Sequence, residues 1–387
     1  MKKYLVTGGA GFIGANFVKY LFERYGDDVD VTVLDKLTYA GHVESLQDEL
    51  DNRPNLSLVV GDIDDRELVD GLVDSFDPDY IVNFAAESHV DRSIDGPRPF
   101  LETNIMGTQT LLEAARQAWS KPEGGFADGK RFLQISTDEV YGALGRHPGE
   151  PGPLELPEAL ARIVAGREAL KTFGPDIFTE ETPLCPHSPY SASKASADMM
   201  AMAYHDTYGF PVLITRCSNN YGPYQFPEKL IPLTISHIVN GEKIPVYARG
   251  ENVRDWLFVR DHCRGIDMVL RQGQPGTIYN IGGFNEQQNI DVVRTLIATV
   301  RRLAEESDEY RKMLRIKPEE VNDSLIEFVK DRPGHDMRYA MNPLRIATEL
   351  GWYPETPFDR GILETVKWCL DNQEWAAAVT SGTHNYL

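Results

Sequence analysis

Short runs of apolar, mostly β-branched residues alternate with longer amphipathic stretches through the first half of the chain. The apolar runs predict strands at 4–7, 29–34, 56–60, 80–85, 132–136 and 212–215. Stretches with apolar residues at helical spacing lie between them and predict helices at 12–25, 67–76 and 101–119. Strand alternating with helix is typical of a parallel sheet that helices cover on both faces. The pattern therefore predicts a doubly wound α/β domain.

After about residue 218 the alternation gives way to shorter elements rich in glycine, proline and asparagine. The chain of 387 residues is long enough for a second domain. We expect a smaller, mostly C-terminal α/β domain that packs over the carboxyl ends of the strands, where parallel sheets bind their ligands. The more regular stretch 255–283 is expected to return to the main sheet. The predicted division is 1–218 with 255–283 for the sheet domain, and 219–254 with 284–387 for the smaller domain.

Charge and cysteine content narrow the class of protein. The chain has 39 lysines and arginines against 59 aspartates and glutamates, a net charge of −20. Such a surface repels nucleic-acid phosphates and anionic lipid, so we expect neither as a partner. No apolar stretch approaches the ~20 residues of a membrane span, and the N-terminal apolar run is too short for a signal peptide. Four cysteines without a Cys-x-x-Cys pair fit a reducing, cytoplasmic compartment and argue against disulfides.

A glycine-rich turn follows the first predicted strand and opens a helix. Residues 7–14 read TGGAGFIG, which places Gly8, Gly11 and Gly14 where a tight turn, close approach to a diphosphate and close helix–strand packing are needed. The helix N-terminus offers unpaired N–H groups to that diphosphate. Asp35 ends the second strand, where a carboxylate accepts from an adenosine ribose and repels a 2′-phosphate. A glycine-rich turn alone is a weak signal, but this context predicts a Rossmann sheet that binds NAD.

A tyrosine and a lysine lie one helical turn apart near the start of another predicted helix, 190–208. Tyr190 and Lys194 project from the same helix face. Free tyrosine has a pKa of roughly 10, and a neighbouring ammonium favours the phenolate that a base requires. An isolated pair of this spacing is more often a surface contact. Together with the glycine-rich turn it resembles the extended, nucleotide-sugar branch of the short-chain dehydrogenase/reductases, which implies that the tyrosine is the acid/base and that the lysine also holds the nicotinamide ribose.

Two carboxyls follow the predicted fifth strand. Thr137 at the strand end can hydrogen-bond a substrate oxygen, and this is all that a simple dehydrogenase or epimerase needs there. Asp138 and Glu139 are additional, and adjacent carboxyls at an apolar strand end are costly without partners or a role. Capping of the next turn explains one acid better than two. A carboxyl pair can divide into a protonated acid and an ionised base, which elimination of water requires.

Longer motifs, in order along nearly the whole chain, resemble the family of dTDP-glucose 4,6-dehydratases. They are DKLTYAG at 35–41, AAESHVDRS at 85–93, TDE at 137–139, NNYGPYQFPEK at 219–229 and DRPGHD at 331–336. The resemblance implies a hydro-lyase that converts dTDP-glucose to dTDP-4-keto-6-deoxyglucose by oxidation at C4, loss of water across C5 and C6, and reduction at C6, with NAD regenerated in each cycle. The alternatives are an NAD-dependent nucleotide-sugar epimerase, a 4,6-dehydratase acting on a UDP-sugar, and a non-catalytic dinucleotide sensor or scaffold, which needs no acid pair.

The motifs and the resemblance together imply the residues of the site. Those implied in catalysis are Thr137, Asp138 as the acid, Glu139 as the base, and the redox pair Tyr190 and Lys194. Those implied in NAD binding are Gly8, Gly11, Phe12, Ile13, Gly14, Asp35, Lys36, Thr38, Asp62, Ile63, Ala85, Ala86, Tyr190, Lys194 and Asn220. Those implied in substrate binding are Ser88, Thr137, Asn219, Lys229, Leu230, Pro245, Tyr247, Arg254, Asn289, Arg332 and His335.

Several of these assignments have a structural alternative. Asp62 can cap a helix instead of reaching the adenine, and Arg332 and His335 can form salt bridges instead of binding the diphosphate. A protein of net charge −20 nevertheless needs a local set of cations to retain a diphosphate. We assign His89 and His205 to structure, and we expect no metal because the histidines lack metal-ligand spacing. The resemblance also implies a homodimer formed through helices 101–119 and 191–208.

An additional segment at 148–176 separates the acid pair from Tyr190. Its first part contains four prolines, which disfavour helix and strand up to residue 157. Residues 158–173 carry Leu160, Ile163, Val164 and Leu170 at helical spacing and predict a helix that begins after Pro157. We expect the segment to lie near the mouth of the cleft, either as a lid or subunit contact or as a surface decoration.

Overall fold

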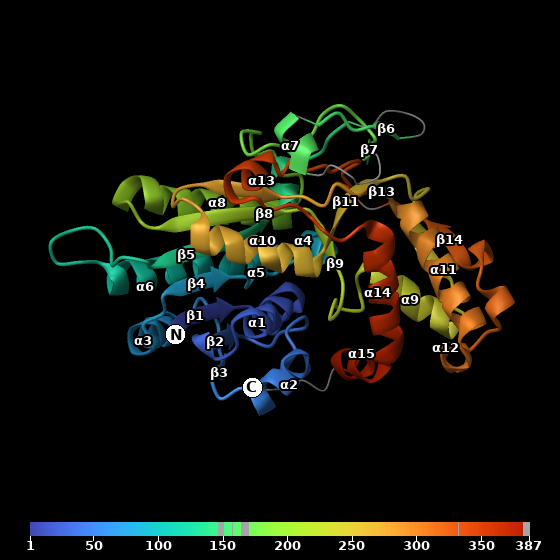
Figure 1. Ribbon diagram of the computed structural model, residues 1–387, viewed down its shortest axis with the longest axis horizontal. Coiled ribbons are helices and arrows are strands. Elements are labelled where there is room, and N and C mark those ends of the chain that lie inside the picture. The colour runs from blue at the N-terminus through green and yellow to red at the C-terminus, as the bar shows by residue number, and fades with distance from the viewer. Residues whose placement is uncertain (146–150, 157, 164–169, 332, 382–387) are drawn as a thin grey trace.

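A seven-stranded parallel sheet forms the centre of the computed structural model, which describes residues 1–145, 151–156, 158–163, 170–331 and 333–381 (Figure 1). Its strand order is β12-β8-β5-β4-β1-β2-β3, and every neighbouring pair is parallel. The predicted doubly wound Rossmann sheet is confirmed. The strands are β1 Lys2–Thr7, β2 Val29–Asp35, β3 Leu56–Val60, β4 Tyr80–Asn83, β5 Arg131–Thr137, β8 Val212–Cys217 and β12 Ile278–Ile281.

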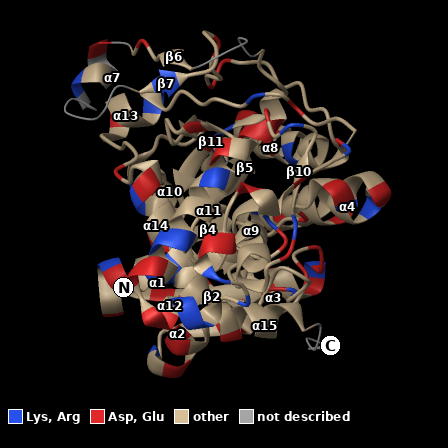
Figure 2. Cartoon of the chain, turned by 90° about the vertical axis from the view of Figure 1, so that its right-hand side faces the viewer, with Lys and Arg blue, Asp and Glu red and all other residues tan. Residues whose placement is uncertain are grey.

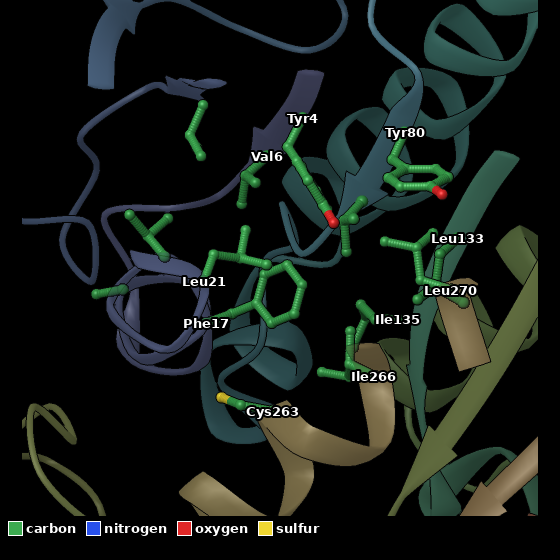
Figure 3. Close-up of a cluster of buried hydrophobic side chains, with 14 of the residues drawn as sticks. Tyr4, Val6, Phe17, Leu21, Tyr80, Leu133, Ile135, Cys263, Ile266 and Leu270 are labelled. Carbon is green, nitrogen blue, oxygen red and sulfur yellow. The ribbon is translucent and has the colours of Figure 1, made fainter. Parts of the chain in front are cut away.

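Helices cover both faces of this sheet because alternate strand residues point to opposite sides. Tyr4 and Val6 belong to one buried core, whereas Leu5 between them belongs to the other. Figure 3 shows the first core, in which Phe17 and Ile266 meet the strand side chains. The helices of the first face are α1 Phe12–Tyr25, α10 Val259–Gln272 and α13 Leu344–Leu350, and those of the second are α3 Arg66–Phe76, α6 Thr108–Trp119 and α8 Pro189–Tyr208.

The predicted helix at 101–119 is divided into three consecutive pieces. A short helix, α5 Arg98–Leu101, continues into a π-helical segment, η3 Glu102–Gly107, and then into α6. The side chain of Asn104 in η3 is buried and bonds to the backbone of Glu87. A π-helical turn rotates side chains away from regular spacing and is frequent at functional sites. The shorter helices α2 Gln47–Asn52 and α4 Val90–Asp95 lie on the connections after β2 and β4.

A second core is formed by residues within 221–258, 290–325 and 358–370. Two small sheets surround it. The first has the order β13-β11-β9, from Glu286–Gln288, Val253–Phe258 and Asn219–Tyr221, and the second pairs β10 Ile244–Tyr247 with β14 Ile326–Val329. Its helices are α9 Leu230–Asn240, α11 Asn289–Glu306, α12 Asp308–Met313 and α14 Phe358–Asp371.

The chain crosses between the two cores more often than the predicted boundaries allow. Within the stretch 255–283, β12 is a strand of the main sheet and α10 packs against that sheet. In contrast, β11 lies in the separate three-stranded sheet. Ile346 and Trp352 lie in the range predicted for the smaller domain and instead pack in the main core. The Trp352 indole donates to the carbonyl of Asp261 at 3.0 Å. The exact domain division stays a prediction.

The C-terminal helix α15, Gln373–Thr380, lies beside the N-terminal part of the chain, near α2 (Figure 1). The Trp375 indole donates to the Ser45 hydroxyl at 3.3 Å. Trp375 also packs edge-on against Trp368, and both rings contact Tyr224. This aromatic cluster joins the C-terminus to the loop that follows β9.

The additional segment contains a small hairpin rather than one long helix. Strands β6 Gly152–Pro153 and β7 Lys171–Thr172 pair antiparallel, and α7 spans Glu158–Ile163. The predicted helix 158–173 is therefore wrong at its C-terminal end, because the pairing with β6 draws residues 171–172 into a strand. Val164 and the rest of 164–169 lie outside the described residues. Leu154 and Leu170 pack with Phe284 and Ala347 of the main body, beside α13.

Acidic and basic residues are interspersed over the outer helices, for example on α4 and α12 (Figure 2). Within the described part of the chain, no helix is both long and apolar enough to cross a bilayer.

Candidate active site

A cavity of about 490 Å³ opens over the carboxyl ends of β1, β2, β4, β5 and β8. Strand order reverses between β1 and β4, and such a reversal is where open α/β sheets bind ligands. All of the predicted catalytic and NAD-binding residues line this cavity. Three predicted substrate residues outside those sets, Ser88, Asn219 and Lys229, line it as well. The structure thus brings together residues that are widely separated in the sequence between Gly8 and Lys229.

The glycine turn at the base of the cavity has no room for side chains. Gly8 has a φ of +66°, and a Cβ on it would lie 2.5 Å from the Ala85 nitrogen. A Cβ on Gly14 would lie 2.3 Å from the Gly8 carbonyl oxygen. The turn therefore packs directly against β4 and against the first turn of α1. Its backbone faces the cavity closely enough for a dinucleotide diphosphate to reach the helix N-terminus, so the residues present fit NAD.

Asp35 holds two loops at the rim of this cavity. Its buried carboxylate accepts from the backbone N–H groups of Ala10, at 2.9 Å, and Leu37, at 2.8 Å. Burial raises the pKa of Asp35, and the two backbone hydrogen bonds oppose this change. Each carboxylate oxygen can accept a second hydrogen bond, so the group can both order the loops and accept from a ribose hydroxyl.

Asp62 and Lys36 form an ion pair at the same rim, with 2.6 Å between Nζ and Oδ2. Burial opposes ionisation of Asp62, but the hydrogen bond and charge of Lys36 together with the backbone N–H groups of Asp64 and Ile63 outweigh it and lower the pKa of the carboxyl. The other Asp62 oxygen accepts from the Asp64 N–H at 3.0 Å, which caps the turn before α3. The capping role is therefore present, and the adenine contact stays a prediction.

The acid pair lies on a single 3₁₀ turn, Asp138–Tyr141, directly after β5. Thr137 caps this turn by accepting from the Glu139 N–H at 3.2 Å, and its hydroxyl donates to Asp138 Oδ1 at 3.2 Å. Asp138 is only 2% exposed, and its Oδ2 atom is buried without a hydrogen-bond partner. Burial, together with the charges of Glu139 and Asp255, raises the pKa of Asp138 well above its usual value. Burial therefore favours the protonated, neutral form of Asp138.

Tyr190 and Lys194 lie on the buried face of the first turns of α8. The helix begins with a capping box, in which the side chains of Ser188 and Ser191 bond to each other's backbone N–H groups at 3.1 and 3.0 Å. The Lys194 ammonium is buried and donates to the carbonyl of Ile135 at 2.7 Å. This bond fixes the lysine against the end of β5.

The pKa of Tyr190 moves in the direction opposite to the sequence-based hypothesis. Burial raises it well above 10, and the charges of Glu139, Cys217 and Asp138 add to the increase. Burial also lowers the pKa of Lys194, although Asp198 opposes this change. The hypothesis considered only the lysine charge, whereas desolvation is the larger effect. The protein alone therefore holds Tyr190 as a neutral phenol.

Asn104 is a site-ordering residue that the sequence reasoning missed. Its amide donates to the Ser193 hydroxyl at 2.8 Å and to the Glu87 carbonyl at 3.0 Å, and its oxygen accepts from the Glu87 N–H at 2.9 Å. It therefore joins the cavity-lining stretch 84–88 to α8 beside Tyr190. The available signal was an asparagine on the buried face of a predicted amphipathic helix. The π-helical turn that orients its side chain could not be predicted from the spacing of apolar residues.

His262 is a second missed residue, located behind Asn220. Its Nδ1 atom lies 2.9 Å from Asn220 Oδ1, while the Asn220 amide donates to the Ser218 carbonyl at 3.0 Å. Complete burial lowers the pKa of His262 to about 3, so the ring is neutral and Nδ1 carries the donated proton. The pair fixes the orientation of an amide that lines the cavity.

The remaining described substrate candidates lie outside the cavity lining. Arg254 donates to the Asp336 carbonyl at 3.0 Å and stacks over the Tyr339 ring at 4.2 Å. His335 packs edge-on against Tyr247, with 5.8 Å between ring centroids, and its Nδ1 lies 2.7 Å from Asp331. Leu230, Pro245 and Asn289 begin or lie on the neighbouring elements α9, β10 and α11. Arg332 lies outside the described residues.

The two histidines that we assigned to structure make local contacts. His89 Nδ1 accepts from the Arg92 N–H at 3.4 Å at the start of α4, and His205 Nδ1 lies 3.0 Å from the Phe210 carbonyl after α8. No group of three or more histidines, cysteines or acids that could hold a metal ion occurs among the described residues.

The additional segment contributes none of its described residues to the cavity lining. The expected place of the segment near the cleft mouth stays a prediction. The hairpin instead bonds to the fully buried side chain of Arg338, which donates to Thr172 at 2.9 Å and to the Asp176 carbonyl at 2.8 Å. Arg338 also forms a bidentate pair with Glu286, at 2.7 and 3.0 Å.

A dinucleotide turn, an acid at the end of β2 and a Tyr–Lys pair over one cavity define an NAD-dependent enzyme of the short-chain dehydrogenase/reductase type. A family model described as GDP-mannose 4,6 dehydratase matches residues 5–154 and 172–365 and omits part of the additional segment. Proteins named dTDP-glucose 4,6-dehydratase match almost the full length. The one from Xanthomonas campestris pv. campestris (strain B100) is 47% identical and covers 99% of this chain and 97% of its own. One from Escherichia coli is 45% identical with the same coverage. The chain therefore belongs to the dTDP-glucose 4,6-dehydratase family.

Solved structures agree with this assignment. The Bacillus anthracis dTDP-glucose 4,6-dehydratase, crystallised with NAD, has a TM-score of 0.78 at 41% identity and covers 98% of this chain and 100% of its own. The Streptomyces venezuelae enzyme, crystallised with NAD and a second ligand, has a TM-score of 0.79 at 41% identity. The match covers 97% of this chain and 99% of that enzyme. A Thermotoga maritima UDP-glucose 4-epimerase is similar at 25% identity, with a TM-score of 0.73 and coverage of 95% and 98%.

Proposed function

We propose that this protein converts dTDP-glucose to dTDP-4-keto-6-deoxyglucose, with NAD as a retained cofactor. The observation that carries the proposal is the buried Asp138, with a raised pKa, beside Glu139 in the cavity that contains Tyr190. An epimerase of the same fold needs a base and a hydroxyl but has no use for a second, protonated acid. The choice of dTDP over UDP is supported by the names of the relatives.

The residues proposed to hold NAD are the glycine turn for the diphosphate, Asp35 for the adenosine ribose and Lys194 for the nicotinamide ribose. When bound there, NAD supplies the hydride acceptor for oxidation at C4 and the hydride donor for reduction at C6. The carboxylate of Asp35 disfavours a 2′-phosphate, which supports NAD over NADP. Asn220 is held by His262 in a single orientation toward the same cavity.

The protein's own groups carry the protons of the reaction. Tyr190 takes the O4 proton as the phenolate, a form that the positive charges of Lys194 and of bound NAD would favour over the neutral phenol of the protein alone. Glu139 takes the C5 proton that the new ketone acidifies, and Asp138 protonates the departing O6 hydroxyl. Because burial raises the pKa of Asp138, it favours the protonated form that this role requires. Each positioned proton transfer contributes ~10²–10⁴ in rate.

The substrate is proposed to extend from this cavity toward the smaller core. Ser88, Thr137 and Asn219 line the cavity near the acids and would contact the sugar. Lys229 lies at the cavity edge and precedes α9, so its ammonium and the helix N-terminus would both face a diphosphate. Arg254, His335, Asn289 and Tyr247 form the neighbouring group proposed for the nucleoside diphosphate.

The homodimer is proposed on an exposed apolar face of the second sheet surface. Large apolar side chains on α4, α5, η3 and α8 are 40–57% exposed, and they are Ile94, Leu101, Met106, Met199 and Tyr208. An apolar set of this size on adjacent helices typically marks a protein interface. Four of these five residues lie within the predicted dimer helices 101–119 and 191–208, and a second copy of the chain is the proposed partner of the face. We further propose that the dimer works in the cytoplasm, which the four free cysteines support.

Product mass after incubation with nucleotide sugars tests the proposed activity. With dTDP-glucose we expect a product that has lost one water, formed without net consumption of NAD, and much slower turnover with UDP- and GDP-glucose. A product of unchanged mass would identify an epimerase, and no reaction with any of the three sugars would favour a binding protein. Either result would overturn the proposal.

A further inference from the structure

A cysteine, a histidine and an aspartate form a chain of contacts outside the dinucleotide cavity. The Cys185 sulfur lies 3.8 Å from His187 Nε2, and His187 Nδ1 lies 2.7 Å from Asp336 Oδ1. The first two residues belong to the loop before α8, whereas Asp336 comes from the segment that precedes Arg338. The substrate and NAD roles proposed above use none of these three side chains.

The arrangement resembles that of an activated nucleophile. A carboxylate can only accept, so the proton between His187 and Asp336 belongs to Nδ1, and in the neutral ring Nε2 is then the acceptor that faces the thiol. The Tyr339 hydroxyl donates to the other Asp336 oxygen at 2.6 Å and fixes the carboxylate. Nucleophile, base and an orienting acid in hydrogen-bond contact are the features that make a thiol or hydroxyl reactive.

Accessibility separates this thiol from the other cysteines of the chain, all of which lie in the described residues. Cys185 is exposed, Cys217 and Cys263 are buried, and Cys369 is partly covered. Burial raises the pKa of Cys369 to about 12 and that of Cys217 and Cys263 further still. His187 is also open to solvent, with 45% of its side chain exposed, whereas the Asp336 side chain is only 10% exposed. A soluble reagent therefore reaches Cys185 and its base.

We propose that Cys185 is a reversible thiol-modification site that reacts with low-molecular-weight disulfides. His187 accepts the thiol proton, and the Cys185 sulfur attacks one sulfur of the disulfide. The disulfide bond breaks, a mixed disulfide forms on Cys185, and the departing thiolate takes a proton. Cys185 is oxidised and half of the reagent is reduced, so electrons balance without another oxidant. Excess thiol reverses the reaction.

The position of Cys185 connects this chemistry to the substrate site. Its N–H donates to the Val140 carbonyl at 3.0 Å, on the turn that carries the acid pair. Asp336, at the far end of the contact chain, accepts through its carbonyl from Arg254 at 3.0 Å and Asn252 at 3.1 Å. A group attached to Cys185 would displace His187 and disturb this anchor of Arg254. The expected result is weaker substrate binding, a consequence that rests on the proposed function.

Thiol labelling tests the reactivity independently of the enzymatic activity. The NAD-bound full chain is treated with 5,5′-dithiobis(2-nitrobenzoate) at neutral pH, and the labelled residue is identified by peptide mass. We expect rapid labelling of Cys185 alone, no rapid labelling in Cys185→Ser, and a rate about tenfold lower in His187→Gln. Equal rates for Cys185 in the native chain, in His187→Gln and in the urea-unfolded chain would overturn the site.

Kinetics of the modified enzyme test the coupling to substrate. We expect the mixed disulfide to raise the KM for dTDP-glucose several-fold with little change in kcat, and dithiothreitol to restore it. Reagent-treated Cys185→Ser is the control and should keep its KM. Complete modification with unchanged KM would overturn the coupling, whereas an inactive unmodified enzyme would instead refute the proposed function.

Discussion

Burial decides the protonation state of the single residues that face the cavity. Desolvation raises the pKa of Asp138 and Tyr190 and lowers that of Lys194, so each group is pushed toward its neutral form. Buried surroundings of this kind make proton transfers between fixed groups effective, because the groups have little hydration shell to shed. The protonation states of these residues therefore depend more on their burial than on any single neighbouring charge.

The role of Tyr190 is tested by removing only its hydroxyl. Tyr190→Phe keeps the buried ring and should lower kcat by ~10²–10⁴ while NAD binding survives, because only the proton acceptor is lost. Tyr204→Phe on the same helix is the matched control, since its hydroxyl bonds to Gln109 and Glu113. Steady-state kinetics and NAD fluorescence titration measure the two properties. Near-normal turnover of Tyr190→Phe would refute the assignment.

Asp255 should give the folded protein a measurable pH dependence. Burial raises the pKa of this carboxyl to about 6, against the N–H groups of Asn285 and Gly283 that lower it. Its contribution to the free energy of unfolding is therefore full below pH 4 and is lost as pH rises through 6, a change of about 3 kcal/mol. Between pH 4.5 and 7.5 the change is about 2 kcal/mol, and urea unfolding at these two pH values should show that Asp255→Asn loses about this much of the wild-type pH dependence. An equal dependence in both proteins would contradict the burial argument.

Residue types with strict backbone or charge requirements were predictable, and residues that act through tertiary contacts were not. The roles of Gly8, Gly14 and Asp35 could be predicted from the sequence because few residue types fit a tight turn or a ribose contact. The direction of the Tyr190 pKa shift depends on how completely α8 covers the ring, and spacing does not contain that information. Nothing in the sequence around His262 indicates a role in the site. Its role follows from its contact with Asn220, which only the structure shows.

At the scale of elements, the glycine turn and α1 act as one unit. The Cβ of an alanine at Gly14 would lie 2.3 Å from the Gly8 oxygen, so α1 must move away from the turn that faces the diphosphate. Gly14→Ala should abolish NAD binding, as measured by NAD retained after gel filtration. Gly71→Ala in α3 meets nothing within 4 Å and should keep NAD while stabilising the protein by about 0.5–1 kcal/mol. Normal NAD content in Gly14→Ala would contradict the role of the turn.

Regular elements were predicted well because local periodicity defines them. The six predicted strands and α1, α3 and α8 all occur near their predicted bounds. The interruption of 101–119 by η3 and the hairpin at 171–172 escaped prediction for a shared reason. Each arises from a non-local partner: Asn104 bonds to Glu87 and Ser193, and β7 pairs with β6.

At the scale of the whole molecule, the exposed apolar face on α5, η3 and α8 predicts a dimer. Met199 on α8 is 57% exposed, and Met199→Glu should convert the dimer to a monomer because a charge would be buried at the interface. Phe328 on β14 is equally exposed, at 58%, but lies on the other lobe. Phe328→Glu should therefore leave the dimer intact. Sedimentation velocity distinguishes the two masses, and a dimeric Met199→Glu would contradict the proposed interface.

The molecule-wide division into two cores was only partly visible in the sequence. The loss of strand–helix alternation after residue 218 lies close to Tyr221, the first residue of the second core. The return of Ile346 and Trp352 to the main core is set by packing against α10, and no composition change marks it. The functional prediction came from the long sequence motifs, because hydrophobic periodicity indicates only the fold.

The central claim is an internal redox elimination, and isotope transfer tests it most directly. dTDP-glucose with deuterium at C4 is converted in ordinary water, and the label in the product is located by NMR and mass. We predict deuterium at C6, solvent hydrogen at C5 and loss of one water, with Glu139→Gln blocking exchange at C5. Loss of the C4 deuterium to solvent, or its accumulation in released NADH, would contradict the account.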